Sequence, residues 1–406
     1  MASDITLKRS LSLPMLVLYG LGTTIGAGIY ALVGELAGMA GYLAPAAFLV
    51  ASVMAALTAL SFAEMSGRYP RCAGAALYVK EGTTSERLSL LVGLLVICAG
   101  LVSSAAIING FISYLHEFVD YDRTMAIIIV CFAVGVIAAW GIAESVGIAA
   151  FVTLVEIGGL ILVITVSRSG LAELPDRWHE LLPDMDLTSW GSIYAGSLLA
   201  FYAFIGFEDM VEVAEETRNV RRTLPLGIIL TLGITTLLYM AVMITAVFAM
   251  PPEQLAGSEA PLSRIYEHYT NSNPMIISII GLFALINGAL IQLIMAARVL
   301  YGLSSRQLLP AVFRQVNART KTPLFATIFA TAAIMTLALA GRLATLAEAT
   351  SLIMLCVFAL VNLSLIRVKQ RDPSPHGLIV FPIFVPVLGF LLSTGFVLLE
   401  VIGWSG

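Results

Sequence analysis

Two short glycine-containing stretches hold the residues whose types and spacing could bind a small molecule. Four of the nine residues from Gly20 to Gly28 are glycine, within an apolar run. Each glycine disfavours a helix by about 1 kcal/mol relative to alanine. The second stretch, 201–209, places Gly206 beside two carboxylates in another apolar run. One interpretation is close helix–helix contact through small residues. The other is that the helix unwinds once within each of the two stretches.

An unwound helix offers backbone groups that can bind charge. Freed N–H groups begin a half-helix whose positive end favours a carboxylate, and freed carbonyls can accept from an ammonium group. The candidate carboxylate-binding residues are Gly26, Ala27 and Gly28. The candidate ammonium-binding carbonyls lie at or near Thr24, Ile25, Tyr202, Ala203 and Ile205. A site with both ends suits a zwitterion, such as a free amino acid.

Glu156 is the third candidate for chemistry. Eleven residues without charge stand on each side of it. An ionised carboxylate in the middle of a membrane span costs about 2.5–3.5 kcal/mol on insertion scales. One interpretation is a permanently protonated side chain that hydrogen-bonds a backbone carbonyl. The other is a proton site, or the partner of a cation within the pocket, and we expect Glu156 to couple protons to the function.

The composition of the chain shows what must position these residues. Of its 406 residues, 59% are apolar and 12% are charged, and the net charge is −4. A soluble domain carries about 25% charged residues. The composition therefore excludes an ordinary soluble enzyme, a disordered scaffold and a nucleic-acid-binding protein, and it indicates a multispan membrane protein.

No sequence pattern indicates a metal or a cofactor. The four cysteines, at 72, 98, 131 and 356, have no metal-ligand spacing. Residues 26–31 match G-x-G-x-x-A, but no strand precedes them, so a dinucleotide site is not expected. Because no hydrolase or phosphate-binding motif is present either, we expect a protein that is not an enzyme.

Eleven stretches are long and apolar enough to cross a bilayer, which takes about 20 helical residues. The predicted spans are 10–34, 36–63, 88–115, 124–143, 145–167, 187–207, 224–252, 269–297, 322–341, 349–366 and 377–399. Runs of this length favour helices over transmembrane strands.

The basic residues predict the orientation of these spans. With the N-terminus inside, 17 Lys and Arg fall in cytoplasmic segments and 5 fall outside. Positive loops stay on the cytoplasmic side. Short loops and the lack of sorting signals favour the cytoplasmic membrane of a prokaryote, with a cytoplasmic N-terminus.

The two glycine stretches occupy equivalent places in two five-span units. Gly26 and Gly206 are 180 residues apart, each in the first span of its unit. Since five is odd, the second unit enters the membrane from the opposite side. Paired interruptions in such inverted repeats point to a substrate site. We expect the repeats at 10–168 and 187–367, with an additional helix at 377–402.

Three acidic residues follow the second glycine stretch on one helical face. They are Glu208, Glu212 and Glu215, at i, i+4 and i+7. One interpretation is a solvated inner vestibule in which the acids pair with Arg68, Arg218 or Arg298. The other is an acidic funnel for a cationic substrate.

These motifs together resemble the amino acid–polyamine–organocation transporters, most of all the cationic amino acid transporter branch and its bacterial relatives. The resemblance rests on residues 22–30, on FAEM and YP at 62–70, on FYAFIGFE at 201–208, and on EETRN before LP at 215–225. It extends from about residue 10 to 370. It implies an all-α integral membrane protein with a five-plus-five inverted-repeat (LeuT-like) fold, in which helices one and six are broken.

The resemblance also implies roles for the site residues. Helix one would bind the substrate carboxylate at Gly26, Ala27 and Gly28, and helix six would bind the amine at Tyr202, Ala203 and Ile205. Tyr202 matches an aromatic residue that gates the pocket. The chain departs from the family at Glu156, where many proton-coupled relatives carry lysine. It also has one span after the repeats where two are usual, so a dimer interface built on the last helices is not carried over.

The sequence therefore predicts a secondary transporter of L-amino acids that works by alternating access, as a proton symporter or as an exchanger. Sodium coupling is not expected, because residues 287–298 contain no Ser or Thr to bind it. The alternatives are a cationic amino acid or polyamine exchanger, and a non-transporting receptor or partner-dependent subunit with the same fold. The expected partners are an amino acid, protons and membrane lipid. The chain would act as a monomer or homodimer, with or without an accessory subunit.

Overall fold

A computed structural model describes residues 11–71, 74–119, 121–140, 146–317 and 319–404. The long helices are α1 (Leu13–Ala40), α2 (Ala44–Arg68), α4 (Glu86–His116), α5 (Arg123–Trp140), α6 (Val146–Val166), α8 (Leu187–Tyr202), α9 (Val220–Ala249), α12 (Met275–Ser305), α13 (Leu324–Ala340), α14 (Leu343–Arg371) and α15 (Phe384–Trp404). The short helices are η1 (Gly41–Leu43), α3 (Gly74–Thr83), η2 (Arg168–Glu173), α7 (Leu174–Arg177), η3 (Trp178–Leu181), η4 (Phe207–Glu216), α10 (Pro252–Ala256), α11 (Pro261–Thr270) and η5 (Ala311–Arg314).

Each of the eleven predicted spans coincides mainly with one long helix, and span 36–63 also takes in the end of α1. The number of membrane crossings stays a prediction. By length and composition, eight stretches of the described chain can span a membrane, or nine with the bent pair formed by α6 and the helices after it. One of the eight is a single run, Leu13–Arg68, that contains both α1 and α2. Helix α13 is apolar but shorter. Residue 10 and residues 141–145 of the predicted spans lie outside the described residues.

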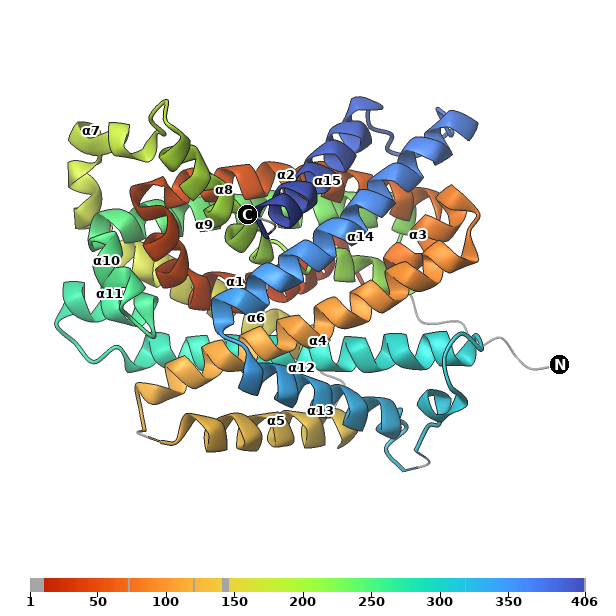
Figure 1. Cartoon of the computed structure of the whole chain (residues 1–406), viewed down its shortest axis with the longest axis horizontal. Coiled ribbons are helices and arrows are strands. Elements are labelled where there is room, and N and C mark those ends of the chain that lie inside the picture. The colour runs from red at the N-terminus through yellow and green to blue at the C-terminus, as the bar shows by residue number, and fades with distance from the viewer. Residues whose placement is uncertain (1–10, 72–73, 120, 141–145, 318, 405–406) are drawn as a thin grey trace.

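Helices at equivalent places in the two predicted units contact one another, among other helix contacts. Helix α1 contacts α8, α2 contacts α9, α4 contacts α12, and α5 contacts α13. The contact of α1 with α6 in the first unit has its counterpart in the contact of α8 with α14 in the second. Figure 1 shows α5 and α13 along one edge of the molecule. Most of α1 and the second half of α8 are buried, so the first helix of each unit reaches the interior.

Two ends of the molecule can be told apart by their short helices. Helices α7, α10 and α11 gather at one end, and α3 lies at the opposite end (Figure 1). We call these the α7 end and the α3 end. Local signals place the helices that run between them: Ser85 caps α4 by accepting from the Leu88 N–H at 3.3 Å, and Asp186 caps α8 by accepting from the Ser189 N–H at 2.6 Å.

The predicted breaks in the first and sixth spans are both present. Within α1, Gly26 has non-helical torsions (φ −23°, ψ −116°). Helix α8 ends at Tyr202, and the chain turns through four residues before η4 begins at Phe207. Gly206 closes this turn with φ +125°, a conformation that L side chains rarely adopt. The all-helical fold class with two broken helices is therefore confirmed.

Candidate functional site

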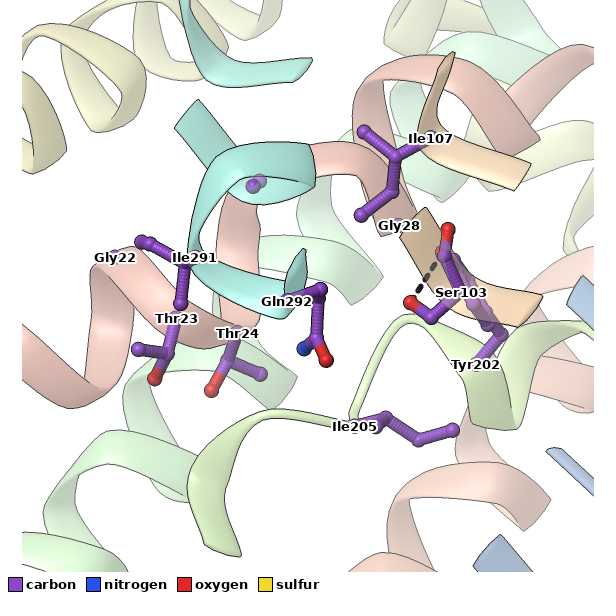
Figure 2. Close-up of a pocket in the computed structure, with 12 residues that line it drawn as sticks. Gly22, Thr23, Thr24, Gly28, Ser103, Ile107, Tyr202, Ile205, Ile291 and Gln292 are labelled. Atoms are coloured by element: carbon purple, nitrogen blue, oxygen red, sulfur yellow. Dashed lines mark hydrogen bonds between the residues drawn. The ribbon is translucent and has the colours of Figure 1, made fainter. Parts of the chain in front are cut away.

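A cavity of about 430 Å³ lies where the break in α1 faces the turn between α8 and η4. We call it the central cavity. Its lining residues are Gly22, Thr23, Thr24, Gly26, Gly28, Ser103, Ile107, Tyr202, Ile205, Gly288, Ile291 and Gln292. They come from α1, α4, α8 with its following turn, and α12 (Figure 2). None of these residues is charged, so a ligand held here binds to backbone groups, hydroxyls and one amide.

The two breaks are in direct contact. The Thr23 hydroxyl donates to the Gly206 carbonyl at 3.0 Å. A Cβ at Gly206 would overlap the Thr23 carbonyl group, and a Cβ at Gly28 would lie 2.8 Å from the Ala203 Cβ. Real carbon atoms do not approach so closely. Glycine is therefore required at both positions for the two segments to meet.

Five of the eight predicted substrate-binding residues line the central cavity: Thr24, Gly26, Gly28, Tyr202 and Ile205. Ile25 and Ala203 are fully buried and do not line it. The backbone of Ala27 belongs to α1, and its side chain lies outside what the structure describes.

The backbone groups near the break differ in how they are engaged. The Thr24 carbonyl accepts a hydrogen bond from the Tyr239 hydroxyl at 2.8 Å, so α9 already satisfies one freed acceptor of α1. The Tyr202 carbonyl accepts from the Ile205 N–H at 3.1 Å. Within the described chain, no hydrogen bond reaches the carbonyls of Ala203 and Ile205. Of these two residues, Ile205 lines the central cavity, whereas Ala203 is buried beside it.

The substrate-binding residues predicted from the sequence include none from α4 or α12. The Ser103 hydroxyl lies 3.0 Å from the Tyr202 hydroxyl and joins α4 to α8 (Figure 2). The Gln292 side chain points from α12 into the space between the α1 break and Ile205 (Figure 2). In the sequence, Ser103 and Gln292 are each a polar residue within an apolar span. Such a residue is as compatible with an interhelical hydrogen bond as with a ligand contact.

Glu156 lies behind α1 and does not line the central cavity. Its side chain is buried, at 1% exposure. Its backbone carbonyl accepts from the Tyr30 hydroxyl at 2.6 Å, and the Tyr30 carbonyl accepts from the Tyr114 hydroxyl at 2.8 Å. The carboxylate is close enough to Tyr30 and Tyr239 to act on both electrostatically. Glu156 is thus linked to the α1 break through Tyr239, which donates to Thr24.

Two further cavities continue from the central cavity toward the α3 end. The second, of about 420 Å³, shares Ser103, Ile205 and Gln292 with the first. Glu208 and Asp209 also line it. The third, of about 800 Å³, is joined to the second by a residue that lines both, Met295.

The three predicted vestibule acids have different surroundings. The Glu208 carboxylate accepts from the Gly206 N–H at 2.9 Å, in the turn that precedes η4. Glu212 lines the third cavity together with Arg298 and Arg306. Glu215 is exposed and lines none of the three. The route is thus bordered by charges of both signs.

Arg68, one of the expected partners of those acids, instead belongs to a buried cluster at the α3 end. Its guanidinium lies 2.8 Å from the Glu64 carboxylate, and the Lys369 ammonium lies 2.7 Å from the same carboxylate. The Phe381 N–H donates to Glu64 at 2.9 Å. This cluster joins α2 to α14 and to the segment that leads into α15.

Two contacts link separate segments at the α7 end. His116 lies 3.0 Å from Glu259, which joins the end of α4 to the segment between α10 and α11. The Arg177 guanidinium stacks over the Tyr42 ring, with 4.9 Å to its centroid. Its hydrogen bond to Glu180 lowers the pKa of that carboxyl below its usual value.

Comparison with known proteins identifies a family of similar sequences. Residues 11–403 match the family model described as amino acid permease. The chain is 30% identical to the vacuolar cationic amino acid transporter 2 of Arabidopsis thaliana, over 92% of this chain and 61% of that protein. It is 26% identical to a branched-chain amino acid permease of Bacillus subtilis, over 91% of this chain and 83% of the other. The chain spans about three fifths of the length of the plant relatives it matches.

Two further comparisons bear on fold and substrate. The structure of a manganese transporter mutant from Eremococcus coleocola has the same fold, with a TM-score of 0.65 at 13% identity, covering 99% of this chain and 90% of that one. A methylthioribose transporter of Bacillus subtilis is 26% identical, over 96% of this chain and 87% of that protein. Similar sequences thus carry names with different substrates.

Proposed function

The chain belongs to the amino acid permease family, and on that premise we propose that it carries an L-amino acid across a membrane by alternating access. Its apolar helices make it a multi-pass membrane protein. The observation that carries the proposal is the central cavity, which is uncharged and lies between two helix breaks. Such breaks at mid-membrane supply polar backbone where a zwitterion can bind.

The substrate would lie across the two breaks. Its carboxylate would bind the N–H groups of Gly26, Ala27 and Gly28 on α1. Its ammonium group would bind the α8 turn at Ala203 and Ile205, whose carbonyls accept no hydrogen bond in the described chain. The hydroxyl pair of Ser103 and Tyr202 borders the same space. This arrangement needs neither a metal nor a cofactor.

The direct test is uptake of a labelled amino acid panel into proteoliposomes, with and without an inward proton gradient. Saturable uptake of one or more amino acids is the expected result. An absence of uptake in both conditions, even with the same amino acids preloaded for exchange, would overturn the proposal in favour of a receptor or partner-dependent subunit.

Proton coupling through Glu156 is part of the proposal. Burial of the side chain and its electrostatic link to Tyr239 support it, because Tyr239 bonds the α1 break. A proton on Glu156 would thereby change the field at the substrate site. Glu156→Gln should abolish accumulation driven by the proton gradient while leaving exchange intact. Accumulation by this variant equal to that of the wild type would refute the coupling role, and a requirement for sodium at constant pH would refute the choice of ion.

A cationic amino acid or polyamine is the second candidate substrate. Glu208 and Asp209 line the cavity next to the central one and could attract a cationic side chain. The names of the plant relatives agree with this choice. The panel should therefore include arginine, lysine and a polyamine beside neutral amino acids, and selective uptake of the cations would decide for this candidate.

The proposal also includes the orientation of the chain in the membrane, its cellular location and an internal repeat. The N-terminus and the α3 end would face the cytoplasm of a prokaryotic cell, and residues 10–168 and 187–367 would be inverted repeats followed by the helix at 377–402. The matched helix contacts of the two units support the repeat. Labelling of single cysteines introduced at exposed Arg314 and Glu173, one at each end, tests the orientation in intact cells.

A further inference from the structure

The third cavity, at the α3 end, carries three charged side chains and we call it the vestibule cavity. Glu212 enters it from η4, and Arg298 and Arg306 enter it from α12. Its volume of about 800 Å³ is roughly twice that of the central cavity. Apolar residues of α12, among them Met295 and Leu303, form most of the remaining wall.

The vestibule cavity holds opposite charges that do not pair with each other. Across the described chain, neither arginine forms an ion pair within 4.0 Å or a side-chain hydrogen bond, and Glu212 forms none either. Arg298 and Arg306 nevertheless act on Glu212 electrostatically across the cavity. Gly74 of α3 leaves room for the Glu212 carboxylate, since a side chain there would collide with it. The cavity therefore separates opposite charges and holds space between them.

This arrangement fits a ligand that carries both charges. A guanidinium presents a planar fork of donors that binds a carboxylate in a bidentate way. A carboxylate such as Glu212 accepts from an ammonium group by charge-assisted hydrogen bonds. An isolated anion would satisfy the arginines but would repel Glu212, and a simple cation would do the reverse. A zwitterion satisfies both.

The vestibule cavity is connected to the central cavity through the second cavity. Met295 lines both the vestibule cavity and the second cavity, which in turn shares three lining residues with the central one. Within the second cavity, the Oδ2 atom of Asp209 is buried and has no hydrogen-bond partner among the described residues. An ammonium group moving along this route therefore meets an acceptor between the two ends.

We infer that the vestibule cavity is a second binding site for a zwitterionic amino acid, with Arg298 and Arg306 on its carboxylate and Glu212 on its ammonium group. The inference rests on the proposed transport function. It adds a second binding site on the route between the α3 end and the central cavity. An amino acid would bind there before it enters the central cavity or after it leaves.

Initial transport rates in right-side-out and inside-out membrane vesicles test this site, with an amino acid that the wild type transports as the probe. Arg298→Gln should raise the half-saturating concentration from the α3 face about ten-fold, the equivalent of one charge-assisted hydrogen bond. From the opposite face the constant should stay within two-fold. The matched control is Arg314→Gln, which removes the same charge from the exposed helix η5 and should change neither constant.

A second measurement is independent of transport rates. Saturation binding of the labelled amino acid to the purified chain should give two molecules per chain for the wild type and one for the Arg298→Gln/Arg306→Gln variant. One molecule for both, equal changes from both faces, or displacement by acetate as effective as by the amino acid would overturn the inference. A wild type that binds and transports no amino acid of the panel would instead refute the proposed function, and the second site with it.

Discussion

Replacement of Gly206 by alanine tests whether the contact between the two helix breaks holds the site together. Gly206 has φ +125° and accepts a hydrogen bond from the Thr23 hydroxyl at 3.0 Å. An added Cβ would lie 2.7 Å from the Thr23 carbonyl carbon and closer still to its oxygen. Both obstacles are backbone, so a change of side-chain rotamer relieves neither.

The size of the effect follows from these two obstacles. A residue held in a sparsely populated backbone region costs about 1–3 kcal/mol. Relief of the overlap requires the α8–η4 turn and the α1 break to separate by about 1 Å, to reach a normal contact of about 3.5 Å. A displacement of about 1 Å at a binding site can cost about 100-fold in rate. Gly206→Ala should therefore lower uptake about 100-fold and also lower the thermal midpoint of the purified chain.

Uptake into proteoliposomes and thermal unfolding of the same preparations give both quantities. The control is Gly233→Ala in α9, because a Cβ there meets nothing within 4 Å. This exchange in a helix interior should keep uptake and stabilise the chain by about 0.5–1 kcal/mol. Wild-type uptake by Gly206→Ala, or an equal loss in Gly233→Ala, would refute the reasoning.

Three further predictions address other contacts. Glu64→Gln should destabilise the chain by about 3–5 kcal/mol, because it leaves a buried arginine and lysine without their shared carboxylate; an unchanged thermal midpoint would contradict it. Tyr239→Phe should raise the half-saturating substrate concentration, since it releases the Thr24 carbonyl and leaves that acceptor at the break unsatisfied; equal constants in transport assays would exclude this role. The pKa of Glu180 is lowered in the folded chain by its hydrogen bond with Arg177. This bond therefore stabilises the fold above about pH 4.3, the pKa of a glutamate in the unfolded chain. The contribution is lost as the pH falls through the lower pKa of the folded chain. The thermal midpoints of wild type and Glu180→Gln should therefore differ at pH 7 and converge at pH 2, and a constant difference would oppose it.

The sequence predicted the features that depend on neighbouring residues. Long apolar runs must form helices in a bilayer because every backbone group has to be satisfied within the segment. Gly26 and Gly206 predicted the two breaks because the cost of glycine in a helix is local. For the same reason, the fold class and five cavity-lining residues could be derived before the packing was known.

Features that depend on packing between distant segments could not be derived. The pairing of Arg68 with Glu64 and the hydrogen bond from Tyr239 to Thr24 join helices whose mutual rotation no local pattern encodes. The Thr24 carbonyl seemed available to an ammonium group, yet α9 supplies it with a donor. Glu156 stood out in sequence by its isolation, but only the structure places it behind α1 rather than in the cavity wall.

The cavities and the contacts at the α7 end indicate which contacts would change in the proposed alternating access. The three connected cavities extend from the breaks toward the α3 end. At the α7 end, His116 contacts Glu259, and the cavity there shares no lining residue with these three. In the proposed mechanism the opposite state would close the vestibule cavity, and Glu212 would then pair directly with Arg298 or Arg306. A bound zwitterion occupies the same charges and excludes that pairing. High amino acid concentration on the α3 face should therefore hold the protein in this state and slow uptake from the other face, an effect that Arg298→Gln should weaken.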